Sequence, residues 1–73
     1  MNKLPAAKNL SDAEYRFLLK VFADHNRSMG IEERKHYSLT DIVKVKKNFK
    51  ENCFEVYYSN GEWFHYFPNG TWC

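Results

Sequence analysis

Apolar residues in the first half of the chain recur at the spacing of an α-helix. From Tyr15 to Phe22 they fall at positions i, i+3, i+4 and i+7, while charged residues form the opposite stripe. Ser11 and Glu14 have the spacing of a capping box, in which a hydroxyl and a carboxylate bind free N–H groups of the first turn. Gly30 is placed to end the helix, because glycine readily adopts the left-handed conformation. The pattern predicts an amphipathic helix from residue 12 to residue 27 or 29.

The middle of the chain has a less regular pattern. Residues 31–37 are mostly charged and lack a clear period, which predicts a connection with one irregular turn. In residues 38–50, Ser38 and Asp41 could cap a second helix, whereas the β-branched residues from Ile42 to Val45 favour a strand, and we expect the strand. The helical alternative has the order helix, helix, hairpin, which resembles a truncated winged helix with a basic second helix.

The last third of the chain alternates in polarity and contains two turn signals. Asn60-Gly61 suits a two-residue type I′ turn, in which both central residues need a positive φ, and this turn pairs Tyr58 with Trp63. The second signal, Asn69-Gly70, folds the last residues back along the preceding strand. The segment after Cys53 is therefore predicted to be an antiparallel meander.

This register divides the side chains of the sheet between two faces, because neighbouring residues of a strand point to opposite sides. The face expected to receive the helix carries Phe54, Val56, Tyr58, Trp63, His65, Phe67 and Trp72, extended by Val43, Val45 and Phe49 if Glu51-Asn52 forms the first turn. The opposite face carries Lys44, Lys46, Lys50, Cys53, Glu55, Tyr57, Phe64 and Tyr66.

The predicted fold class is α+β: one N-terminal amphipathic helix packed in two layers on a three- to four-stranded antiparallel meander. Residues 1–10 are expected to form a flexible tail and residues 11–73 a single small domain. With 73 residues the chain is too short for two cores, and its 13 aromatic residues exclude a disordered linker. No apolar run is long enough to span a membrane, and only two cysteines occur, so we expect a cytoplasmic protein.

Signatures of catalysis and of metal binding are missing from the sequence. The cysteines and histidines do not form the close pairs of structural zinc sites, and Cys53 and His65 fall on opposite faces in the predicted register. Cys53 thus has no nearby base, and the three glycines are isolated rather than grouped in a phosphate-binding loop. We therefore expect no enzyme, no metal, no cofactor and no small-molecule substrate.

Charge is unevenly distributed along the chain. Residues 34–50 carry a net charge of +5 and residues 51–73 a net charge of −3, within an overall +2. One helix covers only one side of a sheet, so the second face would stay exposed unless residues 4–10 or 31–40 fold over it. We expect this face to bind a protein partner or a second copy of the chain, and nucleic acid is the alternative ligand. The predicted binding residues are Lys44, Lys46, Tyr57, Phe64 and Tyr66.

Overall fold

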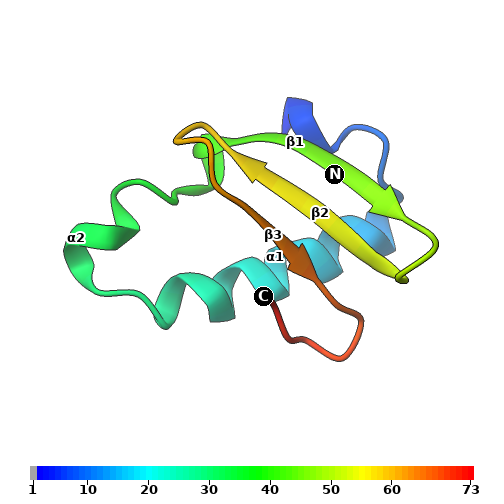
Figure 1. Cartoon of the computed structure of the whole chain (residues 1–73). Coiled ribbons are helices and arrows are strands. Elements are labelled where there is room, and N and C mark those ends of the chain that lie inside the picture. Colours follow the sequence, from blue (N-terminus) through cyan, green and yellow to red (C-terminus); the bar gives the residue numbers. More distant parts are fainter. Residues whose placement is uncertain (1) are drawn as a thin grey trace.

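In the computed structural model, which describes residues 2–73, the first long helix, α1, spans Asp12–Arg27, as the sequence pattern predicts. The capping box is present: the Glu14 backbone N–H donates to Ser11 Oγ at 3.1 Å, and the Ser11 N–H donates to Glu14 Oε1 at 2.7 Å. Figure 1 shows α1 crossing one face of the sheet. The local sequence alone therefore determines where this helix begins.

The helix ends at Arg27 as predicted, but the cap at this end differs from the prediction. Gly30 has a φ of −69° and precedes the short helix α2 (Ile31–Arg34), so it is not a left-handed cap. Instead, the Arg34 side chain donates to the carbonyl oxygens of Asn26, Arg27 and Met29 at 3.0 to 3.2 Å. A cation at this position also interacts favourably with the helix dipole. Within the connection predicted for residues 31–37, α2 is one short turn of regular α-helix, and its residues are exposed.

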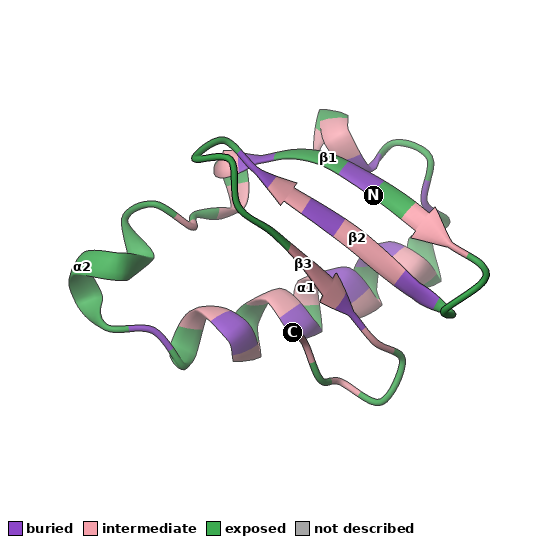
Figure 2. Cartoon of the chain, in the orientation of Figure 1, coloured by how far each residue is buried: buried purple, intermediate pink, exposed green. Residues whose placement is uncertain are grey.

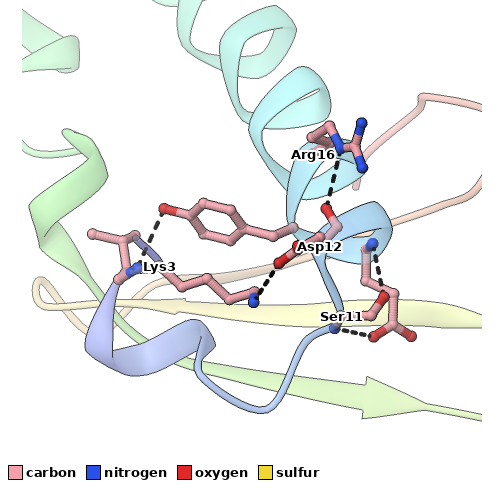
Figure 3. A network of polar contacts seen from close by, with 7 residues as sticks. Lys3, Ser11, Asp12 and Arg16 are labelled. Carbon is pink, nitrogen blue, oxygen red and sulfur yellow. Dashed lines mark hydrogen bonds and ion pairs between the residues drawn. The ribbon is translucent and has the colours of Figure 1, made fainter. Parts of the chain in front are cut away.

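The N-terminal segment packs against the domain, contrary to the predicted tail of residues 1–10. Pro5–Ala7 forms a short 3-10 helix, η1, and Ala7 and Leu10 are buried in the core. The Leu4 N–H donates to the Tyr15 hydroxyl at 3.2 Å, and Lys3 Nζ lies 2.7 Å from Asp12 Oδ1 (Figure 3). Met1 lies outside the described residues. The domain boundary predicted at Ser11 is wrong because apolar residues before it complete the core.

Three antiparallel strands form the sheet in the order β1 (Ile42–Asn48), β2 (Cys53–Tyr58) and β3 (Trp63–Tyr66). The strand predicted within residues 38–50 is confirmed, and the winged-helix alternative, which needs a helix there, is wrong. The Ser38/Asp41 capping box is nevertheless real. It closes a 3-10 turn, η2 (Leu39–Asp41), that leads into β1. After β3 the chain turns back, and Trp72 pairs with Tyr66 as the meander predicts.

The second hairpin has a three-residue loop, not the predicted two-residue turn. The Tyr58 N–H donates to the Glu62 carbonyl at 2.9 Å, and the Gly61 N–H donates to the Tyr58 carbonyl at 3.0 Å. Gly61 has a φ of +89°, whereas Asn60 does not have the positive φ that a type I′ turn requires. Trp63 consequently pairs with Tyr57 and not with Tyr58.

This one-residue shift exchanges the two faces of β3, because the side-chain period of a strand is two. Phe64 and Tyr66, predicted to be exposed, point toward α1, and Tyr66 is 0% exposed. Trp63, His65 and Phe67, predicted to lie beneath the helix, point away from it. The sheet face predicted for each side chain of β3 is therefore wrong.

The first hairpin differs from the prediction at its ends. At the centre of β1, Val45 pairs with Val56 and both are buried, so Val45 faces the core as predicted. Phe49, predicted to lie in the core, is in the loop and is 85% exposed. An irregularity between Ile42 and Lys44 turns the side chain of Val43 outward, so this residue is also outside the core.

Buried residues of α1 and the sheet face each other between the two layers (Figure 2), and a chain of three polar groups runs through this core. His25, on α1, is only 4% exposed. Its Nδ1 lies 2.8 Å from the Tyr66 hydroxyl, which lies 2.5 Å from the Tyr58 hydroxyl. Burial lowers the pKa of His25, raises the pKa of Tyr58 to about 12 and raises that of Tyr66 as well. All three groups are therefore neutral in the folded protein at neutral pH.

The positive φ of Gly61 leads to a first prediction. We expect Gly61→Val to lower the free energy of unfolding by about 1–2 kcal/mol, because the left-handed region is unfavourable for a residue with Cβ and most so for a β-branched one. Gly61→Asn should lose less, since asparagine tolerates this conformation. Urea unfolding of both variants measures the difference, and equal losses would contradict the assigned turn.

Candidate functional site

The face of the sheet opposite α1 is called the open face here. Its side chains come from alternate positions of the strands, and within residues 2–73 no helix packs over it (Figure 1). It carries Lys44, Lys46, Asn48, Cys53, Glu55, Tyr57, Trp63, His65, Phe67 and Cys73. The open face is thus the part of the fold where side chains remain available to a ligand.

A continuous row of rings crosses the open face. Tyr57 and Trp63 are cross-strand partners and stack with centroids 5.5 Å apart and planes 20° apart. Trp63 contacts His65 at 4.9 Å, and His65 stacks on Phe67 at 5.8 Å. Trp63 is 45% exposed even though it lies within a strand. Because neighbouring rings restrict each other's rotamers, the row is a pre-organised apolar surface.

Polar groups fix one end of this row. Lys44 Nζ lies 5.5 Å from the centre of the Tyr57 ring, in the arrangement of a cation–π contact. The Tyr57 hydroxyl donates to Glu55 Oε1 at 2.8 Å, and Asn48 Nδ2 donates to Glu55 Oε2 at 2.9 Å. The hydrogen bond from Tyr57 lowers the pKa of Glu55, and the same bond raises the pKa of Tyr57. Glu55 is therefore a fixed negative charge among the rings.

The structure brings together only part of the predicted site. Lys44, Lys46 and Tyr57 lie on the open face as expected. Phe64 and Tyr66 do not, because the register shift places them against α1, where Phe64 contacts His25 with centroids 4.5 Å apart. The residues that take their places on the open face are Trp63, His65 and Phe67.

A repeated sequence pattern could have indicated the correct register. The segments Tyr58-Ser-Asn-Gly-Glu-Trp63 and Phe67-Pro-Asn-Gly-Thr-Trp72 match at their aromatic, Asn-Gly and Trp positions. In both loops the Asn Oδ1 accepts from the backbone N–H two residues later, at 3.0 Å and 3.1 Å. The residue before each Asn-Gly belongs to the turn, and Pro68 suits the position after the first residue of a type I turn. Three-residue loops follow for both hairpins.

A second group of side chains lies at the other end of the open face, near the first hairpin loop. Glu51, Cys53 and His65 each place a donor atom within 4.8 Å of the others. Cys73 Sγ lies 3.9 Å from His65 Nδ1, and both cysteines are free thiols. The prediction that Cys53 and His65 lie on opposite faces is therefore wrong, because the one-residue shift of β3 moves His65 to the open face. Burial, followed by the nearby carboxylates of Glu51 and Glu55, raises the pKa of Cys53, so its thiol is not activated as a nucleophile.

A pocket lies between α1 and the first hairpin. The Glu14 carboxylate and Lys47 Nζ form an ion pair at 3.1 Å among its lining residues. Its apolar lining is mainly aromatic and consists of Phe17, Phe49, Phe54, Tyr66 and Pro68. Such a lining suits an apolar group more than a charged substrate.

Comparison of the chain with protein-family models, with characterised proteins and with solved structures finds no match. Among residues 2–73, no helix has both the length and the apolar character needed to cross a membrane.

Proposed function

We propose that this chain is a small, non-enzymatic intracellular binding protein, of an adaptor or inhibitor type, that docks onto a protein surface through its open face. The observation that supports this is the row of Tyr57, Trp63, His65 and Phe67 on a sheet face that the described part of the chain leaves uncovered; Trp63 is exposed and the other three rings are partly exposed. Aromatic groups in such a row supply most of the binding energy of protein interfaces. The docked surface is that of another protein or of a second copy of this chain.

The polar groups around the row suit the rim of a protein interface. Lys44 and Lys46 border the rings on the β1 side, while Glu51 and Glu62 lie at the two hairpin loops. A rim with both signs of charge orients a partner and discriminates against wrong ones without adding much affinity. The affinity would then depend on the rings, with Trp63 at the centre.

The central prediction concerns Trp63. We expect Trp63→Ala to weaken binding of the partner, or of a second copy, by about 2 kcal/mol or more, which is roughly 30-fold, because truncated aromatic anchors cost this much. Sedimentation velocity over a range of concentrations measures self-association, and affinity capture from the native cell followed by titration measures binding to another protein.

Ile31→Ala provides a matched control, because Ile31 is an exposed apolar residue on α2 and does not belong to the open face. This variant should bind like the parent protein. If Trp63→Ala and Ile31→Ala bind alike, the open face is not the docking surface.

Nucleic acid is the second candidate ligand, and one observation favours it. Lys44 and Lys46 lie beside the stacked pair of Tyr57 and Trp63, an arrangement in which bases stack on the rings and lysines contact phosphates. Glu55 lies between these groups and would repel a phosphate. A complex with nucleic acid should weaken steeply with salt and be lost in the double variant Lys44→Glu, Lys46→Glu, whereas a protein complex should depend on Trp63 and little on salt.

A further inference from the structure

The cluster of Glu51, Cys53 and His65 has the composition and the placement of a metal site. The three donor atoms lie within 4.8 Å of one another, and the three residues come from the first hairpin loop, from the start of β2 and from β3. In a tetrahedral zinc site with bonds of about 2.0–2.3 Å, the ligand atoms are roughly 3.3–3.8 Å apart. The cluster therefore needs to contract by about 1 Å to hold an ion.

The backbone brings these side chains together for local reasons. Asn52 has a φ of +55°, and this turn residue separates Glu51 from Cys53 so that both can reach the open face. Cys53 is buried and fixed at the start of its strand, and His65 lies diagonally across from it on β3. The Glu51 carboxylate is about half exposed and is the member free to move toward an ion.

We propose that Glu51, Cys53 and His65 bind a zinc ion on the open face. A thiolate, an imidazole and a carboxylate together suit zinc better than magnesium or calcium, which prefer sites made only of oxygen atoms. Three protein ligands leave the fourth position of the tetrahedron to water. The zinc site shares His65 and Glu51 with the proposed docking surface, but Cys53 lies outside the row of rings, and zinc binding is measured without a docking partner.

The two ring nitrogens of His65 already have different surroundings. Nε2 lies 3.6 Å from Glu51 Oε2, while Nδ1 lies 3.9 Å from Cys73 Sγ. Nε2 is therefore the nitrogen that binds the ion, and Cys73 orients the ring through the other nitrogen. Partners of this kind, which contact a ligand and not the metal, affect metal affinity by about 10–100-fold.

Zinc and cobalt binding to the full, reduced chain test this site. We expect one zinc ion per chain in competition with a chromophoric chelator, and a rise in melting temperature, because an ion that binds only the folded state stabilises it. Cobalt should produce the near-ultraviolet charge-transfer band of a thiolate ligand and the visible bands of tetrahedral geometry. A cobalt complex without the thiolate band would overturn the proposal.

Variants assign the ligands. Cys53→Ser and His65→Gln should each weaken zinc binding by more than about 100-fold, and Cys73→Ser by about 10–100-fold. Glu62→Gln removes an exposed carboxylate at the far hairpin loop and should leave zinc affinity unchanged. Circular dichroism establishes that each variant is folded.

Alkylation of the parent protein gives a test that needs no substitution. Bound zinc should slow the alkylation of Cys53 below the rate that burial alone gives in the zinc-free protein and leave Cys73 reactive, which mass spectrometry resolves. Protection of Cys73 in place of Cys53, or zinc affinity that is unchanged in His65→Gln, would show that the ion does not bind at this cluster.

Discussion

Tyr66→Phe is expected to lower the free energy of unfolding by about 2–4 kcal/mol, although it removes a single oxygen atom. The Tyr66 hydroxyl is the only group that joins His25 Nδ1 to the Tyr58 hydroxyl within the described residues, at 2.8 Å and 2.5 Å. Removing it leaves two buried polar groups without this partner, and each such group costs about 1–3 kcal/mol. For 73 residues the total stability is on the order of 4–10 kcal/mol, so the loss is large.

Tyr57→Phe is the matched control for this experiment. Tyr57 is on the open face, and its hydroxyl donates to Glu55, which water can solvate when the bond is lost. We expect a loss below about 1 kcal/mol for this variant. Urea unfolding gives the loss of free energy for both variants when the dependence of that free energy on urea concentration has the same slope as in the parent protein. Equal losses for Tyr57→Phe and Tyr66→Phe would show that the buried chain of hydroxyls does not hold the two layers together.

Acidification is expected to destabilise the fold through His25 before it affects the carboxylates. Burial among the rings of Tyr37, Phe64 and Trp72 and the two tyrosines lowers the pKa of His25 below its ordinary value of 6.5. As pH falls through 6.5, the unfolded chain therefore takes up a proton that the folded chain does not. The contribution of neutral His25 to the free energy of unfolding is fully present above this pH. Below it the free energy of unfolding decreases, with a slope of up to about 1.4 kcal/mol per pH unit, until the pKa of His25 in the folded protein is reached.

The carboxylates act in a separate and lower window. Hydrogen bonds and nearby cations lower the pKa of Asp12, Glu14, Asp41 and Glu55 from ordinary values of 3.8 or 4.5. Their contribution is present above these values and is lost only as pH falls below about 4.5.

Thermal unfolding from pH 5 to pH 7 separates His25 from the other groups. His25→Gln should remove most of the slope in this range, since glutamine does not titrate. His36→Gln replaces an exposed histidine and should keep the slope. A slope that persists in His25→Gln and disappears in His36→Gln would assign the effect to the wrong residue and contradict the prediction.

The candidate site shows how much depends on one loop residue. The sequence indicated an uncovered aromatic and basic sheet face, and it correctly placed Lys44, Lys46 and Tyr57 there. It assigned Phe64 and Tyr66 to that face because Asn60-Gly61 was interpreted as a two-residue turn. The structure includes Ser59 in the turn, and the resulting shift of one residue moves these two rings beneath α1.

The same shift explains why the metal cluster was not expected. Cys53 and His65 are 12 positions apart and lack the close spacing of zinc-binding pairs, so only their pairing across β2 and β3 can bring them together. With the predicted register they would point to opposite faces. Spacing along the chain is therefore a poor guide where ligands come from different strands.

By itself, the sequence determined the features that depend on neighbours along the chain. The capping boxes at Ser11 and Ser38, the helix over residues 12–27 and the turn positions of Gly61 and Gly70 follow from local hydrogen bonds and backbone preferences. Only the tertiary structure decided the register of β3, the burial of His25 and the contacts of the Arg34 side chain with the C-terminal carbonyl oxygens of α1. These depend on contacts between distant segments, where the energies of two alternative pairings are too similar for local preferences to choose between them.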